Sequence, residues 1–162
     1  MALKFNADEV FEMALEIERQ GAKFYRSAAR VFDDPAMQSM FSELAEMEDK
    51  HGQEFASMRK YFFSREGFAQ GFDPDSTASD YLRSMTQGKI FNLKKDLTQT
   101  LNGQNSVKDI LKIAIDAERD SIVFYNSLKQ IVPKSLGRDR VEKIIEEEIE
   151  HIELLSDKIN AL

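Results

Sequence analysis

Four stretches of the chain carry apolar residues at every third or fourth position, the spacing that places them on one face of an α-helix. With approximate bounds, the stretches cover residues 6–32, 35–64, 106–132 and 138–160. Only three prolines and seven glycines occur among the 162 residues, so little interrupts long helices. The pattern predicts an all-α fold, and the length is that of a single domain spanning residues 1–162.

Short turns join the first stretch to the second and the third to the fourth. Asp34 and Pro35 are typical of a helix start, while Pro133 and Gly137 mark the second turn. Because short turns make joined helices antiparallel neighbours, we expect two helical hairpins. Residues 65–104 separate the hairpins, and this length predicts a long crossover within a four-helix bundle, with a flexible linker as the alternative. Short helical pieces are expected in the crossover, at about 77–87 and 92–101.

Charged and polar side chains interrupt each apolar stripe near its middle. They are Glu18 in the first stretch, Glu48 and His51 in the second, Glu118 in the third, and Glu148 and His151 in the fourth. Residues three apart on a helix point the same way, so each Glu-x-x-His motif presents both side chains together. Each motif follows another glutamate by 30 positions, with a turn midway. The glutamates of one hairpin should therefore lie at one level of the bundle.

A shift of 100 positions superposes the first hairpin on the second. All six polar residues coincide under this shift, as do Arg19 with Arg119 and Tyr25 with Tyr125. Apolar positions also agree in kind, for example Leu44 with Ile144. Two such hairpins facing each other about a pseudo-two-fold axis would bring four glutamates and two histidines together.

Such a cluster has the ligands of a two-metal site. Taken singly, a glutamate on an apolar face more often pairs with a cation, and a lone histidine more often fills a core. Four carboxylates buried together, however, require compensating charge, which two divalent cations supply. Oxygen-rich ligands with one imidazole per ion suit iron, with manganese as the alternative. We expect Glu48 and Glu148 to bridge two iron ions. Each ion would also bind one terminal glutamate, Glu18 or Glu118, and one histidine, His51 or His151.

Two tyrosines lie on the same helical faces as the first glutamate of each hairpin. Tyr25 and Tyr125 follow Glu18 and Glu118 by seven positions. They are expected either to hydrogen-bond the ligating carboxylates or to pack as amphipathic core residues.

The composition excludes several classes of binding partner and of metal site. A net charge of −7 argues against binding to nucleic acid or to an anionic membrane surface. The absence of cysteine excludes disulfides, thiolate zinc sites and iron–sulfur clusters. No apolar run approaches the roughly 18 residues of a membrane span, and no signal peptide is evident. A cytoplasmic location with no membrane contact is therefore expected.

The sequence resembles the rubrerythrin branch of the ferritin-like superfamily. The segments that carry the resemblance contain all six polar residues and both tyrosines, and they are 14–25, 44–51, 117–125 and 146–151. The resemblance implies a ferritin-like bundle and a non-haem di-iron oxidoreductase that reduces peroxide or oxidises ferrous iron. It also implies a homodimer, peroxide or oxygen as the oxidant, and a role in peroxide detoxification.

Two departures from the family pattern bear on activity. Rubrerythrins commonly append a cysteine-bound iron domain that delivers electrons, so this cysteine-free chain is expected to need an external electron-donor protein. They also carry an extra carboxylate one turn beyond the ligand of the third core helix, where this chain has Ser121; Gly21 stands at the matching position of the first. The alternatives are an iron storage or handling protein of bacterioferritin type, and a helical partner-binding protein with a structural metal site.

Overall fold

The computed structural model describes residues 7–63 and 96–162, and within these ranges it contains four α-helices and no strand. The helices are α1 (Ala7–Val31), α2 (Pro35–Phe63), α5 (Val107–Ile131) and α6 (Arg138–Asn160). Two short 3-10 helices, η1 (Leu97–Thr100) and η2 (Lys134–Leu136), accompany them. The predicted helix bounds agree with these to within one residue. No described helix is both long enough and apolar enough to cross a membrane.

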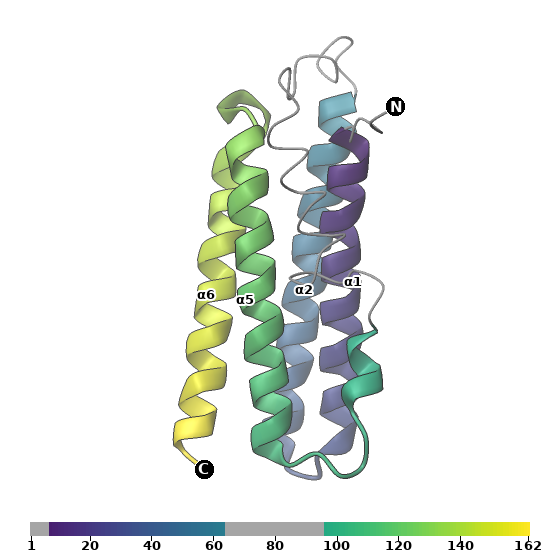
Figure 1. Ribbon diagram of the computed structural model, residues 1–162, viewed down its shortest axis with the longest axis vertical. Helices are drawn as coiled ribbons and strands as arrows, with labels where there is room; N and C mark the ends of the chain where they lie inside the picture. The colour runs from purple at the N-terminus through teal and green to yellow at the C-terminus, as the bar shows by residue number, and fades with distance from the viewer. Residues whose placement is uncertain (1–6, 64–95) are drawn as a thin grey trace, which may run out of the picture.

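The four helices form a bundle of two antiparallel hairpins, as predicted (Figure 1). Within the hairpins α1 packs on α2 and α5 on α6, and across the bundle α1 meets α5 and α2 meets α6. Figure 1 shows α2 ending at one end of the bundle and α5 beginning at the other, so no tight turn joins the hairpins. The helical piece predicted at 77–87 lies outside the described residues. Of the piece predicted at 92–101, the described part holds only η1.

Local sequence signals account for the starts of α2, α5 and α6. Ser106 and Asp109 form a capping box in which each side chain accepts a hydrogen bond from the other's backbone N–H. Asp34 Oδ1 accepts from the backbone N–H of Ala36, 3.2 Å away, at the start of α2. Gly137 enters α6 with a φ of 118°, a left-handed conformation that favours glycine.

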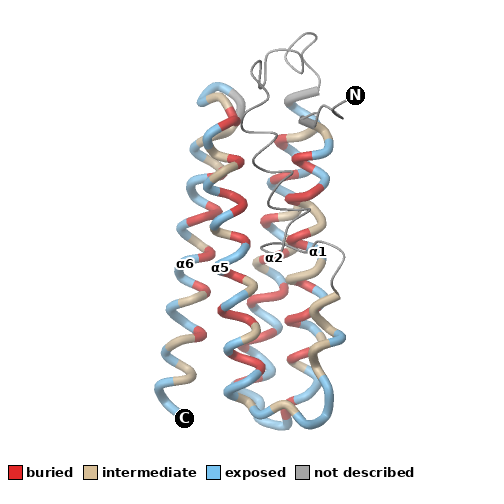
Figure 2. Tube along the Cα trace, viewed as in Figure 1, coloured by how far each residue is buried: buried red, intermediate tan, exposed pale blue. Residues whose placement is uncertain are grey.

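The core is divided into two apolar clusters, one toward each end of the bundle. Buried positions recur along all four helices (Figure 2). One cluster includes Phe11, Phe55, Phe124, Tyr125 and Val141. The other includes Tyr25, Phe32, Phe41, Leu111 and Leu155. The helix segments between these clusters carry the buried polar residues, so a polar layer is enclosed by apolar side chains at both ends.

Candidate metal centre

All six residues that the sequence nominated as ligands lie in this buried polar layer. Each helix contributes from its inward face: α1 gives one glutamate, α5 gives one, and α2 and α6 each give a Glu-x-x-His pair. The six are Glu18, Glu48, His51, Glu118, Glu148 and His151, and none is more than 5% exposed. The apolar periodicity of four separate helices therefore places six polar side chains where water cannot compensate their charges.

The six side chains form two overlapping groups, each able to hold a metal ion. The first consists of Glu18, Glu48, His51 and Glu148, and the second of Glu48, Glu118, Glu148 and His151. Within each group one ligand atom per residue lies within 4.8 Å of the others. Glu48 and Glu148 belong to both groups, which is the arrangement required of carboxylates that bridge two ions. The bridging and terminal roles stay a prediction that metal binding must test.

Both histidines point Nδ1 toward the carboxylates. His51 Nδ1 lies 3.2 Å from Glu148 Oε1 and 3.7 Å from Glu18 Oε2. His151 Nδ1 lies 2.9 Å from Glu148 Oε2 and 3.3 Å from Glu118 Oε1. The two imidazole rings stack with an interplanar angle of 23° and centroids 5.7 Å apart. In both, Nδ1 is the nitrogen available to a metal ion.

The tyrosines connect the hairpins reciprocally. The Tyr25 hydroxyl donates to Glu118 Oε1, and the Tyr125 hydroxyl donates to Glu18 Oε1. Each tyrosine therefore holds the unshared glutamate of the opposite hairpin, which is the first of the two roles considered from sequence. Burial, together with the neighbouring carboxylates, raises the pKa of both tyrosines well above the usual range, so both hydroxyls remain protonated donors.

Burial and mutual charge together favour the protonated forms of Glu18, Glu48 and both histidines when no cation is bound. Burial, then the charge of Glu48, raises the pKa of Glu18; burial, then the charge of Glu148, raises that of Glu48. Burial lowers the pKa of His51, but Glu148 and Glu18 outweigh it and raise the value to about 11. The same competition, with Glu118 foremost among the carboxylates, raises the pKa of His151 to about 12. Protonated imidazoles thus take the place of external cations.

The donor set fits metal ions better than it fits protons. Among the described residues, Glu18 Oε2, Glu48 Oε1 and Glu148 Oε2 are fully buried and accept no hydrogen bond; Glu148 Oε2 lies 2.9 Å from His151 Nδ1, but not in hydrogen-bonding geometry. Such oxygens are costly to bury and are natural ligands of hard divalent cations. Two divalent cations would balance the charge of all four carboxylates.

Two further residues shape the site. A Cβ at Gly21 would lie 2.7 Å from Glu48 Oε2, so the Glu48 carboxylate occupies space that any larger residue would fill. Glu147 Oε2 lies 2.9 Å from His51 Nε2, on the side of the ring away from the carboxylate cluster. The sequence reasoning did not assign Glu147 a role. Comparing it with Met47, its counterpart under the 100-residue shift, would have shown that the two hairpins differ there.

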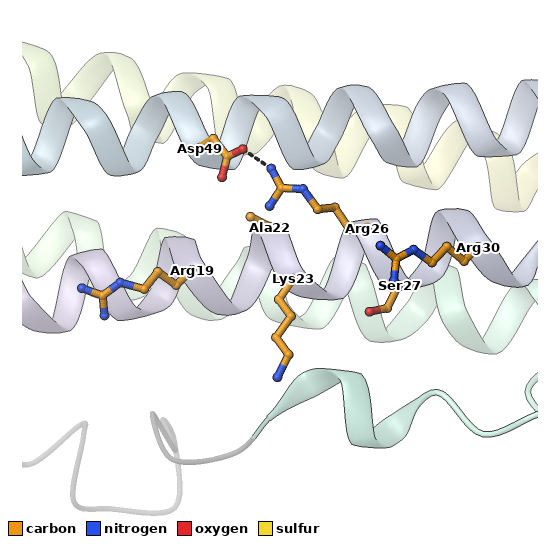
Figure 3. Close-up of a pocket in the computed structure, with 7 residues that line it drawn as sticks. All are labelled: Arg19, Ala22, Lys23, Arg26, Ser27, Arg30 and Asp49. Atoms are coloured by element: carbon orange, nitrogen blue, oxygen red, sulfur yellow. Dashed lines mark hydrogen bonds and ion pairs between the residues drawn. The ribbon is translucent and has the colours of Figure 1, made fainter.

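A surface hollow of about 340 Å³ lies outside this centre, against α1 (Figure 3). Arg19, Lys23, Arg26 and Arg30 line it. Three of these cations are already paired: Arg19 with Glu12 and Glu16, Lys23 with Asp96, and Arg26 with Asp49. The paired acids offset most of the positive charge, so the hollow has little attraction for anions.

Comparison with known proteins identifies the family and the fold of the chain. The family model for rubrerythrin matches residues 9–159, which include all six clustered residues. The chain belongs to the rubrerythrin family. This rubrerythrin-family chain also resembles a solved structure, described as a putative ferritin-like diiron-carboxylate protein from Thermotoga maritima. The two are 24% identical, the alignment covers 97% of this chain and 96% of the other, and the TM-score is 0.72. At that identity the likeness shows the fold, a ferritin-like bundle. No curated protein gives a significant match.

Proposed function

We propose that this protein is a non-haem di-iron oxidoreductase that reduces peroxide or oxidises ferrous iron. The observation that carries the proposal is the pair of four-residue groups sharing Glu48 and Glu148. Membership of the rubrerythrin family supports iron as the metal. The similarity to a protein described as diiron-carboxylate supports two ions in one centre.

The residues of the chain would bind and enclose the metals. Glu18 and His51 would hold one ion, Glu118 and His151 the other, and Glu48 and Glu148 would contact both. Two ferrous ions would supply the two electrons that, with two protons, convert one hydrogen peroxide molecule to two water molecules. The Tyr25 and Tyr125 hydroxyls fix the orientation of Glu118 and Glu18. The apolar clusters on either side exclude bulk water from the layer.

Repeated turnover requires electrons from elsewhere. The chain contains no cysteine, so it carries no thiolate iron centre of its own. An external electron-donor protein would therefore return the oxidised centre to its ferrous state.

The test is metal analysis of protein from iron-supplemented cells, followed by stopped-flow absorbance of the reduced protein mixed with peroxide or with oxygen. About two irons per chain, with repeated oxidation after each re-reduction, are expected of a di-iron oxidoreductase. Faster oxidation by peroxide identifies peroxide reduction, and faster oxidation by oxygen identifies ferroxidation. Iron loading far beyond two per chain in a large particle would indicate iron storage instead. Bound metal that reacts with neither peroxide nor oxygen would indicate that the site has only a structural role.

A further inference from the structure

The two histidines of the centre have different surroundings at Nε2. His51 Nε2 lies 2.9 Å from Glu147 Oε2, and the Glu147 side chain is 25% exposed. The other carboxylate oxygen of Glu147 lies 3.8 Å from Lys143 Nζ. His51 is therefore held at both ring nitrogens, by the ligand cluster at Nδ1 and by Glu147 at Nε2.

His151 has the first of these contacts but not the second. Its Nδ1 faces Glu118 and Glu148, whereas its Nε2 is buried and has no hydrogen-bond partner among the described residues. The position of α2 that corresponds to Glu147 under the repeat is Met47. A thioether is a weak acceptor and carries no charge, so it cannot substitute for a carboxylate beside an imidazole N–H.

Resting on the proposed di-metal function, we propose that Glu147 is a positioning residue that makes the two metal positions unequal. By accepting the Nε2–H of His51, it fixes the tautomer that leaves Nδ1 free for the metal, orients the ring and strengthens its donor character. The ion beside His51 is bound more tightly. The ion beside His151 is bound less tightly and is the first to leave.

The repeat supplies its own matched variants. Glu147→Met gives the second hairpin the residue of the first, and Met47→Glu does the reverse. The double variant exchanges the two residues. Glu146→Met is the control, because Glu146 is exposed, carries the same charge and precedes Glu147 by one position.

The first measurement is anaerobic calorimetric titration of the apoprotein with Fe²⁺. The unmodified protein should bind in two resolved steps. Glu147→Met should weaken the tighter step by about 10- to 100-fold, the usual effect of losing such a partner. Met47→Glu should strengthen the weaker step, and Glu146→Met should change neither. Two equal steps in the unmodified protein, or equal weakening of both steps by Glu147→Met, would overturn the proposal.

The second measurement separates positioning from a general loss of stability. In Co²⁺-loaded protein, the Nε2–H protons of bound histidines give shifted NMR signals that exchange with water. One slow and one fast signal are expected, with the slow one becoming fast in Glu147→Met and the order reversing in the double variant. Unchanged exchange rates would contradict the assignment. If the two Fe²⁺-binding steps are unequal but the reduced protein reacts with neither peroxide nor oxygen, the proposed function fails and this inference stands. If the reduced protein reacts but the two binding steps are equal, the proposed function stands and this inference fails.

Discussion

The two hairpins of the bundle agree in their ligands and differ in what surrounds them. α1–α2 and α5–α6 each provide two glutamates and a histidine at matching positions, and each provides a tyrosine that bonds across to the other hairpin. Around these residues the correspondence fails at particular positions. Gly21 matches Ser121, Met47 matches Glu147, and Phe41 matches Val141. Repetition determines which ligands meet, whereas the unmatched neighbours determine how alike the two metal positions can be.

The aromatic packing shows the same inequality. Tyr25 stacks on Phe41 with ring centroids 6.0 Å apart, and Tyr125 packs against Phe55 at 4.9 Å. Both phenylalanines come from α2, while the corresponding residues of α6 are Val141 and Leu155. Helix α2 therefore supplies an aromatic partner to both tyrosines, in addition to the edge contacts that Phe24 makes with Tyr25 and Phe124 with Tyr125.

The largest effect should come from removing a shared ligand. Glu48→Ala takes a carboxylate from both groups, so metal content should fall from about two ions per chain to nearly none. Glu18→Ala takes a carboxylate from one group only and should leave about one ion. Metal analysis after equilibrium dialysis measures the difference, and Glu148→Ala and Glu118→Ala should repeat it in the second hairpin. Comparable losses from Glu48→Ala and Glu18→Ala would contradict the division into shared and unshared ligands.

A smaller effect is expected where the hairpins differ at Gly21 and Ser121. Gly21→Ala would place a Cβ 2.7 Å from Glu48 Oε2 and displace the shared carboxylate, so affinity for both ions should fall by about 10-fold. Alanine also favours a helix over glycine by roughly 1 kcal/mol, so the melting temperature of the apoprotein should not fall as the affinity does. The control is Ser121→Ala, which removes only a hydroxyl that bonds the Ala117 carbonyl. Equal metal affinity in Gly21→Ala would show that Glu48 has room to move.

The sequence predicts those features of the fold and the metal centre that depend on spacing along the chain. The helices, the hairpins and the meeting of six polar residues follow from periodicity and from turns midway between paired glutamates, because both depend only on distance along the chain. The contact between Glu147 and His51 joins α6 to α2, and its geometry depends on how the hairpins are rotated against each other. The tight approach of Glu48 to Gly21 likewise depends on a side-chain rotamer, which no spacing specifies.

The pH dependence should reveal the two hairpins acting as one charge cluster. The pKa values of His51 and His151 are raised to about 11 and about 12, so the stability they contribute is complete below about pH 6.5 and is lost as pH rises toward those values. The raised pKa values of Glu18, Glu48 and Glu148 act in the same direction. The melting temperature of the apoprotein should therefore fall between about pH 6.5 and 9.

Metal ions should reverse this trend, because they bind to deprotonated ligands and displace protons. The rise in melting temperature on adding Mn²⁺ should increase over the same pH range. Thermal unfolding with chelator and with Mn²⁺ measures both slopes, and the double variant His51→Gln/His151→Gln serves as the control with a flatter apoprotein slope. An apoprotein that gains stability toward pH 9 would be inconsistent with protonated histidines in the cluster.

The smallest effect should come from a surface difference between the hairpins. Arg26 pairs with Asp49 at the rim of the hollow in Figure 3, whereas the matching residues of the second hairpin are Asn126 and Ile149, which cannot form such a pair. Both members of the pair are nearly half exposed, and an ion pair in water gains little. Arg26→Asn should lower the melting temperature by no more than about 3 °C and leave both metal-binding steps unchanged. A marked change in metal affinity would mean that the charge on the outer face of α1 influences metal binding. The difference between the hairpins would then extend beyond the buried layer.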